Sequence, residues 1–137
     1  MDTKMKIKGI QHVGIPTNDI QKSTLFYEGL GFEVVWQTTN KHNEGDVVFL
    51  QQGSLIIEIY DNKHAVMKSG AIDHIALDVT DIDSIFSIVK KSGYKILDDK
   101  VQYLPFWKHG VRFFTIIGPN EEKIEFCERL IPNQEIL

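Results

Sequence analysis

The chain has 137 residues, of which 42% are hydrophobic and 25% are charged, the proportions of an ordinary globular protein. A chain of this length buries enough surface for one core, so we expect a single domain over residues 1–137. Fifteen Lys and Arg against nineteen Asp and Glu give a formal net charge of −4, which argues against nucleic acid as a partner. The composition also excludes a disordered or collagen-like chain.

The N-terminal segment alternates charged and apolar side chains and contains no long apolar run. This pattern is typical neither of a signal peptide nor of a membrane helix, so we expect a cytoplasmic protein with no membrane partner. Cys127 is the single cysteine, and a lone thiol is compatible with a reducing compartment. We expect it to act as a small buried apolar residue.

In chain order, the first half is predicted to form a strand, a helix and three further strands. Apolar, β-branched and aromatic runs predict strands over residues 7–16, 32–39, 46–51 and 55–60. A helix over 19–30 is predicted between the first two strands, because Asn18 and Asp19 can cap its start and Gly31 can end it. The polar segment 61–71 that follows is interpreted as a linker.

The second half repeats this order of elements. Strands are predicted over residues 72–79, 94–100, 111–117 and 123–128. An apolar stripe at helical spacing predicts an amphipathic helix, and its members are Ile82, Ile85, Phe86 and Val89. Thr80 or Asp81 can cap the start of this helix, and Gly93 can end it.

The two halves also repeat each other residue by residue. The matching segments are 10–15 with 72–77 and 19–20 with 81–82, both 62 residues apart, and 55–60 with 122–127, 67 residues apart. The second copy is therefore about five residues longer, and the extra residues fall in 103–110. We predict an α+β fold of two tandem β-α-β-β-β modules, residues 7–60 and 72–130.

The repeat places a histidine in the first strand and a glutamate in the last strand of each module. These residues are His12 and Glu58, then His74 and Glu125. A strand histidine or glutamate is by itself more often structural or solvated. Both glutamates have apolar neighbours, however, and a buried carboxylate is costly unless it is paired, protonated or metal-bound. Two imidazoles and two carboxylates at equivalent positions therefore indicate a site for Zn, Ni, Co, Mn or Fe.

These patterns resemble a known family. The motif Ile-x-His-Val/Ile-x-Ile/Leu around His12 and His74, the pair Phe26-Tyr27 before 29–32 and the closing segment 123–126 are similar to the vicinal oxygen chelate (VOC) superfamily, and within it to glyoxalase I (lactoylglutathione lyase). The resemblance implies paired modules that form a U-shaped mixed β-sheet cleft lined by a metal. It also implies a homodimer, with the site completed either within one chain or between two.

The resemblance assigns the four metal ligands of glyoxalase I to His12, Glu58, His74 and Glu125. Nickel or zinc is then expected, with cobalt, manganese or iron as alternatives. Other members of the superfamily use two histidines and one glutamate, replace a glutamate, or lack the set. The intact set favours lyase or isomerase chemistry on a small-molecule substrate, through the metal-stabilised enediolate of a 2-oxoaldehyde thiol adduct.

For the catalytic base we favour Glu125, with Glu58 as its counterpart, and the sequence does not decide which carboxylate moves the proton. Two other functions stay open. One is a metal-dependent epimerase or isomerase of a sugar-derived or acyl-thioester compound. The other is a non-catalytic protein that binds a small molecule.

The sequence matches some of the substrate-binding residues of glyoxalase I and not others. Where glutathione-dependent relatives place an arginine on the first strand, this chain has Pro16, whereas Asn62 matches a polar residue of their thiol site. The longer loop of the second module offers further candidates for substrate binding, namely Tyr103, Trp107, His109 and Arg112.

Overall fold

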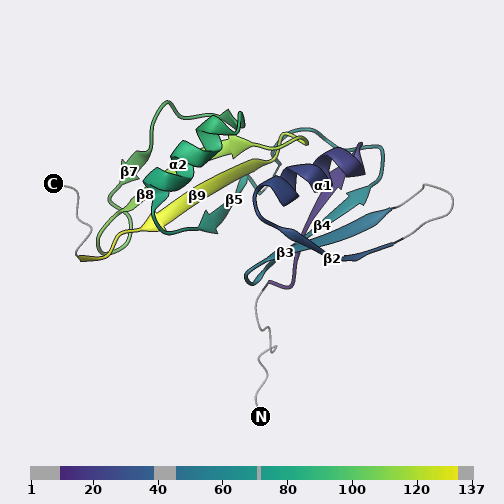
Figure 1. The fold of residues 1–137 in the computed structure, drawn as a ribbon, viewed down its shortest axis with the longest axis horizontal. Helices are drawn as coiled ribbons and strands as arrows, with labels where there is room; N and C mark the ends of the chain where they lie inside the picture. Colours follow the sequence, from purple (N-terminus) through teal and green to yellow (C-terminus); the bar gives the residue numbers. More distant parts are fainter. Residues whose placement is uncertain (1–9, 39–45, 71, 133–137) are drawn as a thin grey trace, which may run out of the picture. The chain divides into compact units, whose positions relative to one another are not determined.

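A computed structural model describes residues 10–38, 46–70 and 72–132 of the chain (Figure 1). The chain divides into two compact units, Met1–Val66 and Met67–Leu137. Each unit contains one helix and one sheet with both parallel and antiparallel strand pairs. The predicted α+β fold is confirmed. No helix in the described part of the chain is long and apolar enough to cross a membrane.

The first unit follows the predicted order of elements. These are β1 (Val13–Thr17), α1 (Ile20–Gly29), β2 (Glu33–Gln37), β3 (Val47–Gln52) and β4 (Leu55–Asp61). The sheet order is β1-β4-β3-β2, with β1 parallel to β4 and the other pairs antiparallel. Helix α1 begins where the sequence predicts, because the Asp19 side chain accepts a hydrogen bond from the backbone N–H of Lys22 at 3.1 Å.

One face of this sheet is covered by α1 and forms the core. Leu50, Ile57 and Ile59 are fully buried there, together with Tyr27 of the helix. A buried hydrogen bond of 2.8 Å between Thr17 and the helix residue Ser23 joins β1 to α1. Because side chains alternate along a strand, the residues between these buried positions point to the opposite face.

The second unit also has one helix, but its strands differ in number from the prediction. The elements are β5 (His74–Asp78), α2 (Ile82–Lys91), β6 (Lys95–Ile96), β7 (Gln102–Leu104), β8 (Val111–Ile117) and β9 (Lys123–Arg129). The sheet order is β5-β9-β8-β6, and β7 also pairs with β8. As in the first unit, the first and last strands, β5 and β9, are parallel neighbours.

The predicted strand over 94–100 is wrong beyond its first residues, and part of the expected loop 103–110 forms a strand instead. The backbone N–H of Thr115 donates to the Asp98 carboxylate at 2.8 Å. This side-chain carboxylate is therefore the acceptor in place of a backbone carbonyl of the neighbouring strand. Ladder pairing therefore stops after Ile96 and resumes at Gln102, which pairs with Phe113. Residues 7–9 and 39, the ends of two other predicted strands, lie outside the described residues.

The core of the second unit lies between α2 and the strands β8 and β9 (Figure 1). Ile82 and Val89 of the predicted apolar stripe are buried. Phe114 contacts Phe86 of the helix edge to face at 5.0 Å and stacks on Phe126 at 4.9 Å. The face of β8 and β9 that carries Phe114 and Phe126 is therefore closed by the helix.

Candidate functional site

The sequence repeat corresponds to the same strand register in both units. Glu58 of β4 pairs with Gly14 of β1, and Glu125 of β9 pairs with Ala76 of β5. Each histidine lies two residues before that partner. His74 is the first residue of β5, whereas His12 immediately precedes β1, so the prediction that His12 lies within a strand over 7–16 is wrong. Both side chains nevertheless contact the glutamate of their unit. Each unit thus carries one histidine and one glutamate at equivalent places on the face away from its helix.

Within each unit, the histidine and the glutamate are close enough to bind one small ligand together. His12 Nε2 lies 3.7 Å from Glu58 Oε1, and the side chains are 33% and 26% exposed. His74 Nε2 lies 3.2 Å from Glu125 Oε2, and the side chains are 46% and 17% exposed. All four side chains are thus accessible to a small ligand without being fully solvated.

The second ring nitrogen of each histidine also has a partner. Nδ1 of His12 lies 3.0 Å from Gln11 Oε1, and Nδ1 of His74 lies 3.0 Å from Asp73 Oδ2. Both partners place an oxygen against Nδ1, which orients each ring so that Nε2 faces the glutamate. An imidazole whose Nε2 faces a carboxylate while Nδ1 has an outer hydrogen-bond partner has the arrangement typical of metal-ligating histidines.

The outer partners differ in charge. The Asp73 carboxylate also accepts from Lys123 Nζ at 3.1 Å, and its hydrogen bonds to His74 and then Lys123 lower its pKa. Gln11 is a neutral amide at the equivalent position, 62 residues earlier. The imidazole of His74 is therefore held by a stronger acceptor than that of His12. Sequence reasoning missed both partners, although the repeat aligns them.

Gly14 makes room for the carboxylate opposite it. A Cβ atom at this position would lie 3.3 Å from Glu58 Oε1 and 3.5 Å from the Tyr60 ring. Ala76 occupies the equivalent position opposite Glu125. The absence of a side chain at residue 14 therefore lets Glu58 lie directly over β1.

Cys127 follows Glu125 by two residues on β9 and is partly buried rather than fully buried. Burial raises the pKa of its thiol, and the charges of Glu125 and Asp78 raise it further. A thiol of raised pKa stays protonated at neutral pH and is a poor metal ligand. Within residues 10–38, 46–70 and 72–132, no three His, Cys, Asp or Glu side chains gather closely enough to hold a metal, and the His–Glu contact in each unit is a pair.

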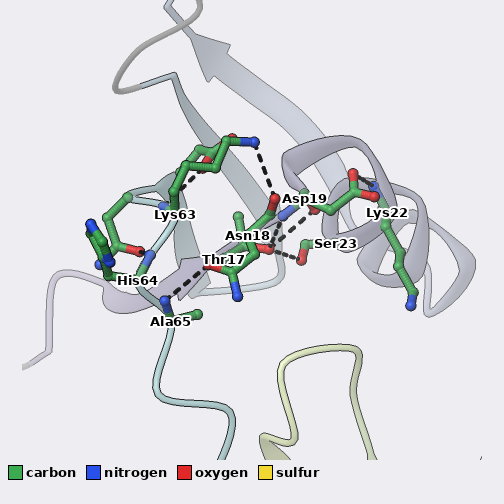
Figure 2. Close-up of polar contacts among 10 residues, drawn as sticks. Thr17, Asn18, Asp19, Lys22, Ser23, Lys63, His64 and Ala65 are labelled. Carbon is green, nitrogen blue, oxygen red and sulfur yellow. Dashed lines mark hydrogen bonds and ion pairs between the residues drawn. The ribbon is translucent and has the colours of Figure 1, made fainter.

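The structure places Asn62 in a turn and not beside Glu58. Its side-chain oxygen accepts from the backbone N–H of His64 at 2.9 Å. The same segment is joined to the start of α1, because the backbone N–H of Ala65 donates to Asn18 Oδ1 at 3.0 Å and Lys63 Nζ donates to the Asn18 carbonyl (Figure 2). Asn62 therefore has a structural contact, and its role in substrate binding stays a prediction.

Arg112 lies away from the face of Glu125. It shares the helix-covered face of β8 with Phe114, and its guanidinium donates to both carboxylate oxygens of Asp83 in α2, at 2.7 and 2.8 Å. These hydrogen bonds raise the pKa of Arg112 and lower that of Asp83. The structure does not bring Arg112 to His74 and Glu125.

The three other residues predicted for substrate binding lie around the β7–β8 connection. Trp107 is 68% exposed, and the guanidinium of Arg129 lies 3.8 Å from the centre of its ring. The Tyr103 ring covers Gly110, and His109 is partly buried. The contacts of Tyr103 and Trp107 are thus with Gly110 and Arg129 rather than with the His74–Glu125 pair, and the binding role of all three residues stays a prediction.

Comparisons with known proteins agree with the fold. Residues 9–126 match the model of the Glyoxalase/Bleomycin resistance protein/Dioxygenase superfamily. The uncharacterized protein YwbC of Bacillus subtilis (strain 168) is 33% identical over 127 residues, which are 89% of this chain and 98% of that protein. YwkD of the same organism is 24% identical and covers 91% of this chain and 100% of its own length.

Two solved structures are similar in fold. The glyoxalase family protein from Enterococcus faecalis has a TM-score of 0.73 at 23% identity, over 90% of this chain and 100% of its own. The fosfomycin resistance protein FosX from Listeria monocytogenes, complexed with Mn(II) and sulfate, has a TM-score of 0.72 at 16% identity, over 92% and 96%. With the matching family model, these findings confirm the resemblance seen in the sequence, and the chain belongs to the Glyoxalase/Bleomycin resistance protein/Dioxygenase superfamily, the vicinal oxygen chelate fold.

Proposed function

We propose that this chain is a metal-dependent lyase or isomerase of the glyoxalase I kind. Its substrate would be the adduct of a 2-oxoaldehyde, such as methylglyoxal, with a thiol. The observation that carries the proposal is the pair of His–Glu contacts at equivalent strand positions, at 3.7 and 3.2 Å. Each contact sets an imidazole Nε2 against a carboxylate, and nitrogen and oxygen donors of these kinds are those of a divalent metal site.

The metal would be held by His12, Glu58, His74 and Glu125. A set of two nitrogen and two oxygen ligands suits nickel or zinc, with cobalt, manganese and iron as alternatives. When bound, the metal supplies positive charge that stabilises negative charge developing on the substrate oxygens. A full set needs one pair from each unit, taken from one chain or from two copies in a homodimer.

Proton transfer would be the task of a glutamate. In this scheme the Glu125 carboxylate removes the proton from the carbon next to the carbonyl and returns it to the neighbouring carbon. Its side chain is 17% exposed and that of Glu58 is 26% exposed, so Glu125 is the better shielded from water. Glu58 would act as its counterpart.

A second candidate function keeps the metal and changes the substrate. The four strands of the first unit contain neither Lys nor Arg, and Pro16 occupies the position where an arginine would bind a carboxylate of glutathione. This absence from the described strands favours a thiol other than glutathione. It equally favours an epimerase or isomerase acting on a neutral sugar-derived or acyl-thioester compound.

The test combines metal analysis with turnover. Purified protein is expected to contain a stoichiometric divalent metal, and Ni²⁺ or Zn²⁺ should raise the melting temperature of the metal-free form. Glu125→Gln should keep the fold and lower turnover of methylglyoxal–thiol adducts by at least about a hundredfold. Glu28→Gln, on the exposed side of α1, is the matched control and should leave turnover unchanged.

Two results would contradict the proposal. A protein with no bound metal and no shift in melting temperature would exclude both enzymatic candidates and leave the non-catalytic binding protein. Metal binding without turnover of any methylglyoxal–thiol adduct would instead point to the epimerase or isomerase.

A further inference from the structure

One row of paired residues crosses all four strands of the first unit. Gly14 of β1 pairs with Glu58 of β4, Glu58 pairs with Phe49 of β3, and Phe49 pairs with Trp36 of β2. Residues that pair in this way share a face of the sheet and lie close enough for their side chains to touch. The row therefore leads from the His12–Glu58 pair directly to two aromatic rings.

Trp36 reaches this face because of an irregularity in β2. The pairing of β2 with β3 shifts between Val34 and Trp36, so that Val35 is an additional residue. Val34 pairs with Leu50, which is fully buried on the helix-covered face. In a regular strand Val35 would pair with Phe49, and Trp36 would point to the other face. A bulge of this kind re-aims a side chain, and bulges are common beside functional sites.

The Phe49 ring contacts both the His12 ring and the Trp36 ring. The centre of the Phe49 ring lies 5.6 Å from that of His12 at an interplanar angle of 86°. The Trp36 ring lies 5.9 Å from Phe49 at 65°. Both are edge-to-face contacts of the kind aromatic pairs prefer. Trp36 is nevertheless 58% exposed, so an indole surface stays open next to the candidate metal ligand His12.

The described strands around the rings carry no positive charge. Strands β1 to β4 contain neither Lys nor Arg, so nothing on them would bind a carboxylate or a phosphate. The second unit differs, because Thr115 occupies the position next to Glu125 that Phe49 occupies next to Glu58. The aromatic rings thus belong to one His–Glu pair and not to the other.

We propose that Trp36 and Phe49 form a binding wall for a neutral, planar, apolar group of the substrate. This group would be an aryl or conjugated substituent next to the oxygens that a metal would bind. This inference rests on the proposed function for the metal, and it adds the substrate class. Phe49 packs between His12 and Trp36 and positions both. Trp36 offers its open face to the substituent, which selects aryl-substituted over methyl-substituted substrates.

The experiment uses two ligands that chelate through the same pair of neighbouring oxygens and differ only in their substituent, benzohydroxamate and acetohydroxamate. Calorimetry on the Ni²⁺-loaded protein should find benzohydroxamate bound at least about tenfold more tightly. Trp36→Ala should reduce that ratio by about five- to tenfold, and Trp36→Phe should restore most of it. Ile88→Ala, at an exposed position of α2, is the control and should leave the ratio unchanged.

A second measurement needs no metal. Benzamide, which carries the aryl group without the chelating pair, should shift the indole N–H signal of Trp36 in the NMR spectrum of the metal-free protein, and acetamide should not. The signal is assigned by its loss in Trp36→Phe. If hydroxamates fail to bind but benzamide shifts the signal, the metal proposal fails and the wall stands. If Trp36→Ala leaves the ratio unchanged, or the signal does not respond to benzamide, the wall is overturned.

Discussion

The Asp73 carboxylate lies 3.0 Å from Nδ1 of His74 and fixes which ring nitrogen faces Glu125. Outer partners of this kind orient a ligating imidazole and increase its basicity, and their loss commonly lowers metal affinity by about ten- to a hundredfold. Asp73→Asn is therefore expected to weaken Ni²⁺ binding by about tenfold, measured by calorimetry on the metal-free protein. Asp99→Asn, an exposed carboxylate outside the pair, is the control.

A carboxylate added beside His12 should have the opposite effect on metal affinity. Gln11→Glu places a carboxylate where His12 now has a neutral amide, so it should strengthen Ni²⁺ binding. An unchanged affinity in both Asp73→Asn and Gln11→Glu would show that neither histidine is a metal ligand.

Glu128 is 5% exposed and accepts hydrogen bonds from the backbone N–H groups of Asp81 and Ile82, at 3.1 and 3.2 Å. A carboxylate at the first turn of a helix satisfies unpaired N–H groups and complements the positive end of the helix dipole. Glu128→Gln is expected to lower the free energy of unfolding by about 1–3 kcal/mol, because its amide nitrogen cannot accept from these donors. Urea denaturation measures the loss, with the exposed Glu121→Gln as reference.

The ion pair of Asp83 with Arg112 should make a small contribution that depends on pH. Hydrogen bonds from Arg112 lower the pKa of Asp83 in the folded state below its ordinary value of 3.8. The stabilisation is therefore present above about pH 4 and is lost as the pH falls through the lowered pKa. Asp83 is 66% exposed, so the contribution is expected to be no more than about 1 kcal/mol.

The comparison of wild type with Asp83→Asn at pH 6 and at pH 3 tests this. The difference in the free energy of unfolding should shrink at the lower pH. Arg112→Gln should remove the same pH dependence. A difference that grew on acidification would refute the assignment of the pair.

Gly110 combines two constraints that can be separated by mutation. Its φ angle is +89°, and a Cβ atom would lie 2.5 Å from the Tyr103 ring. Gly110→Ala should cost about 2–4 kcal/mol, the sum of backbone strain and a steric clash. Gly53 has a φ of +59° and no neighbour within 4 Å, so Gly53→Ala should cost only the backbone part, about 1 kcal/mol.

Gly70→Ala completes the series, because this position has neither a positive φ nor a close neighbour, and it should be nearly neutral. Melting temperatures or urea midpoints rank the three variants. Equal losses in Gly110→Ala and Gly53→Ala would mean that the Tyr103 ring moves aside without cost.

The features predicted from the sequence are those that repeat. The 62-residue offset between His12 and His74 appears in the structure as equal strand register opposite Glu58 and Glu125. The apolar stripe of α2 was predictable for a similar reason, since helical spacing on a half-buried surface leaves a strong pattern.

Features that depend on one residue were not predictable. The bulge at Val35 leaves no mark in a run of β-branched and aromatic residues, so the orientation of Trp36 could not be read from alternation. The early end of β6 depends on the Asp98 side chain replacing a backbone carbonyl. In the sequence, an aspartate that takes this role looks like any other polar residue.

Each histidine lies at the beginning of its unit and each glutamate on its last strand, and the parallel neighbours β1 and β4, or β5 and β9, bring them together. A cation held by either pair would thus connect the beginning of one module to its last strand. Because such an ion would bind the folded pair and not the unfolded chain, its binding free energy would add to the stability of the module, and metal occupancy and folding would be linked.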